Sequence, residues 1–128
     1  NGLRTMSLIG LDAAGAIQSE TISMNGQTLV SSALTYTAVN NWRAVTWGST
    51  GHNEGTVWVG AGAFTSGVPA TQYFAGEIQE NRGNTAYYVV PAGHTLYLRQ
   101  ITLNVATSNK DCTFYVEQSS NGANWFVY

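Results

Sequence analysis

The feature that most constrains this chain is its density of residues that interrupt helices. Gly, Ser, Thr, Asn and β-branched residues break every window long enough for a stable helix. Short runs rich in β-branched and aromatic residues lie between turn residues instead. In several of these runs apolar and polar side chains alternate with the period of two that a half-buried strand requires. The sequence therefore predicts an all-β protein.

The expected strands follow one another at short intervals. They cover residues 5–11, 16–24, 27–31, 34–39, 43–47, 56–59, 72–75, 85–90, 96–105, 112–116 and 125–128. About ten short antiparallel strands in a chain of 128 residues favour a β-sandwich, most simply a jelly roll, with a partly open barrel as the alternative. We expect a single domain over residues 1–128, because no linker, low-complexity segment or internal repeat divides the chain.

Three hairpin turns are expected from their residue types. Residues 12–15 end in a glycine that can adopt a positive φ. Asn25-Gly26 favours a type I′ turn that would fold residues 27–31 straight back on the preceding strand. Residues 91–94 begin with Pro-Ala-Gly, which starts another tight turn.

Other positions are expected to interrupt or bend the strands. Asn40-Asn41 is expected to break the chain between two strands, and the Gly-rich residues 60–69 to turn a corner of the sheet. A shift in the apolar phase near Arg99-Gln100 predicts a bulge or bend.

Charged residues make up 9% of the chain, against about a quarter in an average soluble domain. Hydrophobic residues make up 44%. A neutral polar surface packs against a neighbour at little cost in charge desolvation, so this composition favours a protein that assembles. The net charge is −2 and the five basic residues are scattered, so we expect no nucleic-acid partner.

Neither a membrane span nor a disulfide is expected. No apolar stretch is as long as a bilayer-spanning segment, so we expect a soluble protein without a membrane partner. Cys112 is the single cysteine and lies in an apolar run, which favours a buried free thiol and leaves the compartment open. The chain begins at Asn1 and not at a methionine, which fits a processed product, a fragment or the ordered part of a longer protein.

Residues with catalytic or metal-binding chemistry are few and isolated. His52 and Glu54 share a loop but lack the two further ligands of a metal site, and the other histidine, His94, lies in a turn. Glu77 and Glu80 come nearest to a glycosidase carboxylate pair, yet they share one polar connection. We expect no enzyme, no metal and no cofactor. A hydrolase would need a His or carboxylate cluster in a cleft.

No serine lies in a Gly-x-Ser-x-Gly elbow, and a Ser/His/Asp triad would have to use one of the two histidines. Gly60-Ala61-Gly62 lacks the lysine and the following helix of a phosphate-binding loop. We interpret it as a corner or a bulge.

Four tryptophans and seven tyrosines are the remaining candidates for function. Most are expected to fill the core, but exposed Trp and Tyr rings also form sugar-stacking platforms and interface hot spots. Tyr87 and Tyr88 are consecutive in an expected strand, so they would face opposite sides and one ring would be open to a partner. A carbohydrate-binding or receptor-binding module is therefore an alternative.

Residues 9–15 and 19–26 carry the patterns G-x-D-x-x-G and S-E-T-I-x-x-N-G. Residues 88–98 fit the hairpin pattern Y-x-V-P-A-G-K-T-x-Y-[IL], except that His94 replaces Lys, and residues 53–59 fit the strand pattern N-x-G-T-V/I-x-V. These segments, spread over about two-thirds of the chain, resemble structural proteins of tailed phages and some large DNA viruses.

The resemblance implies a β-sandwich protein at the surface of a virus particle, of the capsid decoration, cement or fibre type. Such a protein would act by contacts with capsid or other virion subunits, as a homo-oligomer and without chemistry. The resemblance names no binding surface.

Overall fold

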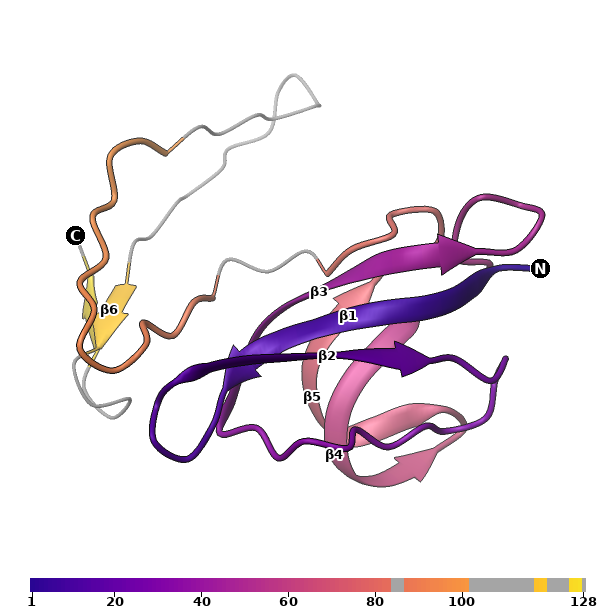
Figure 1. Cartoon of the computed structure of the whole chain (residues 1–128), viewed down its shortest axis with the longest axis horizontal. Helices are drawn as coiled ribbons and strands as arrows, with labels where there is room; N and C mark the ends of the chain where they lie inside the picture. Colours follow the sequence, from indigo (N-terminus) through magenta and orange to yellow (C-terminus); the bar gives the residue numbers. More distant parts are fainter. Residues whose placement is uncertain (84–86, 102–116, 120–124, 128) are drawn as a thin grey trace. The chain divides into compact units, whose positions relative to one another are not determined.

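The computed structural model describes residues 1–83, 87–101, 117–119 and 125–127. Contacts divide the chain into two compact units, Asn1–Leu96 and Tyr97–Tyr128, and each is described by itself. All regular elements among the described residues are antiparallel strands, and none of these residues is helical (Figure 1). The prediction of an all-β protein is confirmed.

The first unit contains a three-stranded sheet in the order β2-β1-β3 (Figure 1). Its strands are β1 (Leu3–Leu11), β2 (Ile17–Ser23) and β3 (Ala38–Trp47). Side chains of β1 alternate between a buried face and a partly exposed one, as the period-two pattern predicts. The expected strands 5–11 and 16–24 are confirmed within two residues at each end, and the expected strand 43–47 is confirmed as the second half of β3.

The β1–β2 turn forms as its residue types predict. The Asp12 carboxylate accepts hydrogen bonds from the N–H groups of Ala14 and Ala16, at 2.8 and 2.9 Å, and Gly15 has a φ of 75°. An Asp side chain that bonds the backbone two residues further on is typical of an Asx turn. This local chemistry sets the register in which Leu11 lies opposite Ile17.

The second sheet of the first unit is a hairpin of β4 (Val57–Thr65) and β5 (Val68–Gly76). Ser66 and Gly67 form its turn, both with positive φ. The expected corner over residues 60–69 is therefore wrong, because the Gly-rich run belongs to the hairpin itself. Register shifts beside Gly60 and after Ala61 confirm that the Gly60-Ala61-Gly62 segment is bulged.

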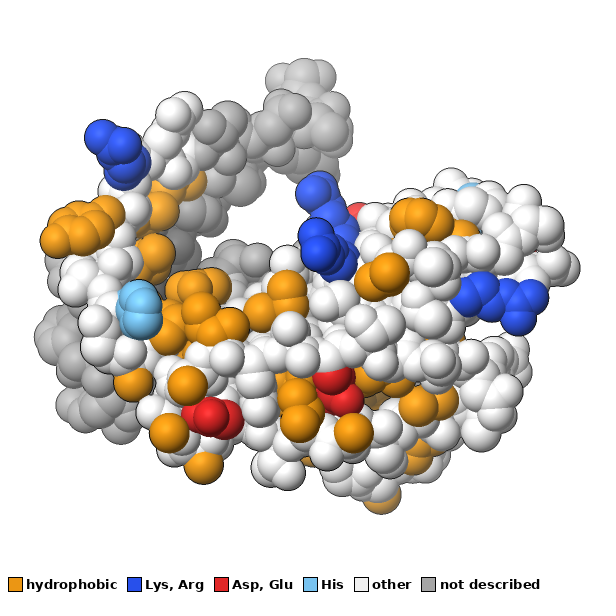
Figure 2. Space-filling view, in the orientation of Figure 1, with side chains coloured by type: hydrophobic (Ala, Val, Ile, Leu, Met, Phe, Trp, Pro, Cys, Tyr) orange, Lys and Arg blue, Asp and Glu red, His pale blue; other side chains and the backbone are white. Residues whose placement is uncertain are grey.

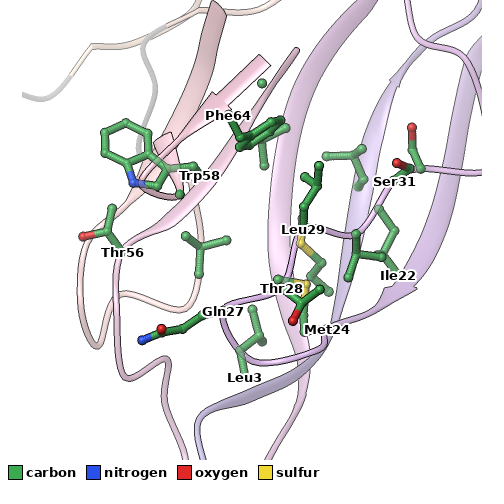
Figure 3. Close-up of a pocket in the computed structure, with 18 of the residues that line it drawn as sticks. Leu3, Ile22, Met24, Gln27, Thr28, Leu29, Ser31, Thr56, Trp58 and Phe64 are labelled. Atoms are coloured by element: carbon green, nitrogen blue, oxygen red, sulfur yellow. The ribbon is translucent and has the colours of Figure 1, made fainter. Parts of the chain in front are cut away.

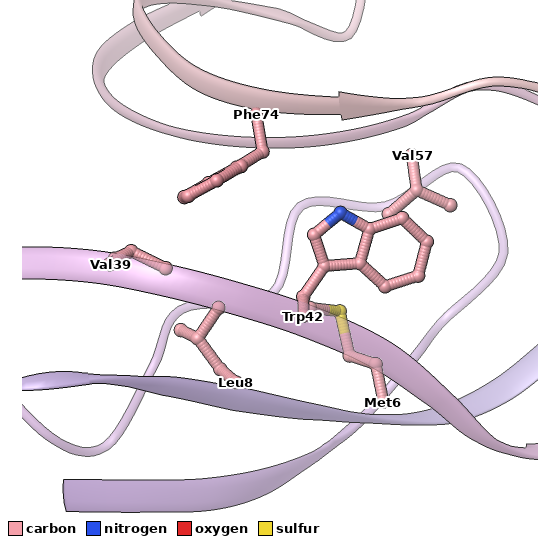
Figure 4. Packing of buried hydrophobic residues seen from close by; sticks show 6 residues of the cluster. All are labelled: Met6, Leu8, Val39, Trp42, Val57 and Phe74. Carbon is pink, nitrogen blue, oxygen red and sulfur yellow. The ribbon is translucent and has the colours of Figure 1, made fainter. Parts of the chain in front are cut away.

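Six buried side chains form the core and join the two sheets (Figure 4). They are Met6, Leu8, Val39 and Trp42 from the first sheet and Val57 and Phe74 from the second. Trp42 is 0% exposed and is the largest of them. Its indole N–H has no hydrogen-bond partner within the described residues, so packing carries its burial.

Two glycines make room for the Trp42 ring. A Cβ built on Gly76 would overlap the six-membered ring of the indole, and one built on Gly83 would lie 2.7 Å from both Cδ1 and Nε1. Gly83 also donates its N–H to the Trp42 carbonyl at 3.0 Å. The backbone at both glycines therefore lies directly against the ring.

The expected break at Asn40-Asn41 is wrong, because β3 runs through both residues. A register shift against β1 makes Asn40 the extra residue of a bulge. Its buried amide accepts from the N–H of Val89 and donates to the Val89 carbonyl, both at 2.8 Å. The side chain thereby fastens residues 87–90 to β3 in place of a backbone ladder.

The expected strand 27–31 is also wrong, although the turn before it forms. Thr28 donates to the Asn25 carbonyl at 3.0 Å and Gly26 has a φ of 58°, but the pairing stops at that bridge. Side chains of β2 instead bind the following segment: Gln18 donates to the Thr35 carbonyl at 2.6 Å. The expected strand 34–39 is likewise reduced to its last two residues, in β3.

In the rest of the chain the outcomes differ. The expected strand 56–59 is confirmed over 57–59 in β4, and the expected strand 72–75 is confirmed within β5. The 91–94 turn is confirmed by the bond from His94 N–H to the Pro91 carbonyl. Residues 87–90 and 96–101 are described and form no strand. The expected strand 112–116 and Cys112 lie outside the described residues.

The second unit contains a short antiparallel pair, β6 (Glu117–Ser119) and β7 (Trp125–Val127). Glu117 pairs with Val127, and Ser119 with Trp125. The expected closing strand is thus confirmed over 125–127, while β6 was not expected. The single domain and the count of about ten strands stay predictions.

Replacing Gly76 with alanine is expected to lower the free energy of unfolding by about 1–3 kcal/mol, because the added methyl group overpacks the Trp42 ring. Chemical denaturation measures the change. Gly55→Ala is the matched control: no atom lies within 4 Å of its built Cβ, so stability should change by less than about 0.5 kcal/mol. Equal effects of the two substitutions would contradict this account of the core.

Candidate functional site

The residues with catalytic potential lie apart or in local turns. Half-buried His52 places Nδ1 3.1 Å from the carbonyl oxygen of Asn53, and Glu54 is exposed. Glu80 accepts from the N–H of Glu77 at 3.3 Å, so these two carboxylates belong to one turn and do not face each other across a cleft. Within the described ranges, no three His, Cys, Asp or Glu side chains are grouped.

His94 lies at the tip of the 91–94 turn, as the sequence predicts. It is exposed, and its Nδ1 lies 2.9 Å from the Ala92 carbonyl oxygen. The turn is attached to the β1–β2 hairpin, because Ala92 donates its N–H to the Gly15 carbonyl at 2.8 Å. Two of the three expected turns are thus neighbours in the first unit.

An open pocket of about 1220 Å³ lies between β1, β2 and β4 and the segment that follows β2. Leu3, Ile22, Met24 and Leu29 line one side, and Phe64 lies across from them (Figure 3). Polar groups at its border come from Gln27, Thr28, Ser31 and Thr56. Glu54 is the single charged side chain among the described residues that line it, so the pocket is suited to apolar side chains or to an uncharged ligand.

Tyr36 lines this pocket, and Glu20 lies near Tyr36. Ala33 donates its N–H to one Glu20 oxygen at 2.9 Å, while the other oxygen and the Tyr36 hydroxyl are buried without a hydrogen-bond partner among the described residues. Burial and the nearby negative charge of Glu20 raise the pKa of Tyr36 to about 12. Tyr36 therefore stays neutral throughout the physiological range.

A buried asparagine organises the loop from residue 48 to residue 56. Asn53 is 1% exposed, and its Nδ2 donates to the carbonyls of Gly55 and Glu77 at 2.9 and 2.7 Å. Its Oδ1 accepts from the N–H of Asn81, whose own Oδ1 accepts from the Asn53 N–H and from the indole of Trp47. Sequence reasoning missed this network, because asparagines beside turn residues look like solvated loop.

The network holds a backbone that is unfavourable by itself. Gln79 and Asn81 have φ values of 72° and 59°, in the left-handed region that favours glycine. The reciprocal hydrogen bonds between Asn53 and Asn81 offset this cost. They also hold residues 77–83 beside β3, where Ala44 donates its N–H to the Asn81 carbonyl at 2.8 Å.

Exposed apolar side chains are the most prominent surface feature. The structure describes thirteen large ones, against seven buried hydrophobic residues. The thirteen are Ile17, Leu29, Leu34, Val45, Trp47, Tyr73, Ile78, Tyr87, Tyr88, Leu96, Tyr97, Leu98 and Ile101. Orange patches in Figure 2 mark hydrophobic side chains on one face. Where such side chains form a contiguous patch, the patch is typical of a protein interaction surface.

The tryptophans divide between core and surface. Trp42 is fully buried, Trp58 is half-buried and Trp47 is 43% exposed, while the side chain of Trp125 lies outside the described part. Tyr87 and Tyr88 are both about half exposed, so the expectation that they face opposite sides of one strand does not apply to this segment.

Comparisons with protein-family models, with curated proteins and with solved structures found no match to this chain. Over the described residues, the structure contains no helix that is long and apolar enough to cross a membrane.

Tyr36→Phe is expected to remove one component of alkaline destabilisation. The folded-state pKa is raised above the ordinary 10.0, so the contribution of Tyr36 to stability is complete below pH 10 and is lost as pH rises towards 12. Unfolding free energies measured across that window should therefore fall more steeply for the wild type than for the variant. Stability profiles that run parallel in the wild type and the variant between pH 10 and 12 would contradict the raised pKa of Tyr36.

Asn53→Asp is expected to lower the free energy of unfolding by more than about 3 kcal/mol at pH 7, because an ionised carboxylate would face two carbonyl oxygens in a buried site. Burial raises the pKa of such a carboxyl, so the loss should shrink as the pH falls and the group is protonated. Urea denaturation at neutral and acidic pH measures both effects.

The control for this substitution is Asn25→Asp. Asn25 is exposed and Asp-Gly supports the same turn as Asn-Gly, so stability should change by less than about 0.5 kcal/mol at either pH. A loss at position 53 that does not depend on pH would mean that the carboxylate charge is not its cause.

Proposed function

We propose that the chain is a non-enzymatic structural protein of a virus particle, of the capsid decoration, cement or fibre type, which acts by contacts with other subunits. The observation that carries the proposal is the number of exposed apolar side chains in a chain with few charges. Association through such a surface buries apolar area without desolvating many ions.

The motif resemblance supports the viral part of the proposal. The G-x-D-x-x-G segment contains the Asx turn of Asp12, and the P-A-G segment contains the turn that bonds back to Gly15. The two segments that resemble the family are therefore joined by the bond between Ala92 and Gly15. A shared contact gives them a common structural reason to occur in one sequence.

We further propose that the complete fold is a β-sandwich of the jelly-roll type with about ten strands in one domain. The three-stranded and two-stranded antiparallel sheets, joined by one core, supply five of these strands in the first unit. Residues 112–116, which lie outside the described residues, have the alternation to supply another.

The protein is proposed to form a homo-oligomer at the particle surface. Sedimentation equilibrium of the full chain should give a closed, symmetric oligomer, and immunogold labelling should place it on the outside of particles purified from its source. A chain that sediments as a monomer, together with particles that carry no label, would overturn the proposal.

Substituting Leu96 and Leu98 with serine is expected to weaken self-association by at least about tenfold. The unfolding free energy of the isolated chain should stay nearly unchanged, because both side chains are more than half exposed. Sedimentation and denaturation measure the two effects. The control, Thr95→Ser, changes a neighbouring exposed side chain without removing apolar bulk. A large loss of stability with unchanged association would mean that these leucines serve the fold and not an interface.

A carbohydrate-binding module remains the second candidate, favoured by the exposure of Trp47 and Tyr97, the latter at 81%. Exposed rings stack on sugars as well as on proteins. Saccharide titrations monitored by tryptophan fluorescence distinguish the two functions: saturable quenching by a sugar would favour this candidate, and its absence across a glycan array would remove it.

A further inference from the structure

Two arginines stand directly opposite each other in the first unit. Residue 82 forms an antiparallel bridge with residue 43 of β3, so Arg43 and Arg82 lie on the same side of the backbone pair. Both are exposed. Figure 2 shows basic side-chain atoms, in blue, gathered over the β3 side of the visible face. Two of the five basic residues of the chain are therefore neighbours on one face.

The charges of this pair are not neutralised within the described part of the chain. Neither guanidinium forms an ion pair there, and Glu80, the nearest acidic residue in sequence, is turned onto the N–H of Glu77. Like charges directly opposite each other destabilise a strand pair. A chain with so few charges would not need this repulsion for folding, which points to a contact outside the chain.

Hydrogen-bond donors continue from the arginines across the sheet. The register places Ser7 of β1 opposite Arg43, and Thr21 of β2 opposite Ser7. Thr21, Ser7, Arg43 and Arg82 thus form one cross-strand row on the face of the sheet that points away from Met6 and Leu8. We call this set the arginine row.

We propose that the arginine row binds carboxylates of an acidic segment in a protein partner. Each planar guanidinium donates two parallel hydrogen bonds to a carboxylate, and the hydroxyls of Ser7 and Thr21 donate to further oxygens. Binding would replace the repulsion between the arginines by attraction to the partner. The identity of the partner as a virion subunit rests on the proposed function, whereas the carboxylate chemistry does not.

An acidic protein segment fits this row better than a nucleic acid. A polyanion that carries a phosphate at every nucleotide needs a long basic track, but here the row contains two cations in a protein of net charge −2. That net charge repels a large polyanion. A short acidic segment would touch the paired guanidiniums directly, at distances shorter than the screening length of physiological salt, so its attraction would be screened less.

The binding test uses a fluorescein-labelled hexa-glutamate peptide and fluorescence anisotropy at low ionic strength. The wild type should bind it, and Arg43→Gln and Arg82→Gln should each weaken binding by about tenfold. Arg4→Gln is the matched control, since Arg4 is an exposed β1 arginine without a paired cation, and it should change affinity less than about twofold. A heparin hexasaccharide serves as the competing anion.

A stability measurement checks the repulsion without any ligand. Each single substitution, R43Q or R82Q, should raise the melting temperature at low salt by about 1–4 °C, because it removes the like-charge contact. The double variant should be no more stable than either single variant, since the same repulsion is removed once. Lower melting temperatures would show that the arginines support the fold, which would overturn the proposal.

The remaining outcomes also decide the question. Peptide affinities that fall equally in R4Q, R43Q and R82Q, or a wild type that does not bind the peptide, would overturn the carboxylate site. Heparin binding that depends on the pair, without peptide binding, would replace it by a sulfated-glycan site. If R43Q and R82Q lose peptide binding but self-associate normally, the row stands as a site for another subunit. If the peptide experiment overturns the carboxylate site while immunogold labelling still places the protein on the particle, the proposed function stands without the arginine row.

Discussion

The first unit depends on the complete burial of one indole ring. Trp42 projects from β3 into the core, and backbone at Gly76 and Gly83 lies close enough to the ring that neither position has room for a Cβ. The same side chain therefore ties the end of β5 and the segment after the 77–80 turn to the central sheet. Its indole N–H finds no acceptor among the described residues, so the contact is one of shape and apolar area.

Hydrogen bonds from buried asparagine side chains hold further segments against the sheet. Asn40 binds both backbone groups of Val89, and Asn53 exchanges hydrogen bonds with Asn81. In each pair an amide, which has both a donor and an acceptor, replaces a missing backbone partner. These bonds place the 87–92 segment and the 77–83 segment beside the sheet, and the second of them carries Arg82 to its position opposite Arg43.

This order of interactions connects the fold to the proposed function. The ring and the amides are inside, while the outside carries many apolar side chains, few charges and an arginine pair that no described residue neutralises. Because the described part of the chain folds without surface ion pairs, its surface is available for contact with other subunits. The open pocket and the arginine row offer such a partner two different kinds of contact, one apolar and one directional.

Local chemistry determined much of this structure in advance. The alternation in β1 and β2, the Asx turn at Asp12 and the Pro91 turn follow from residues that are neighbours in sequence, and so the all-β class and these turns could be predicted. Side chains acting over long sequence separations decided the rest. The Asn25-Gly26 turn formed without its expected strand 27–31, and the side chains of Gln18 and Glu20 bind the backbone of Thr35 and Ala33 further along this segment. The Asn53 network and the opposition of Arg43 to Arg82 join residues 28 and 39 positions apart, and no periodicity in a sequence records which distant residues the packing of one indole will bring together.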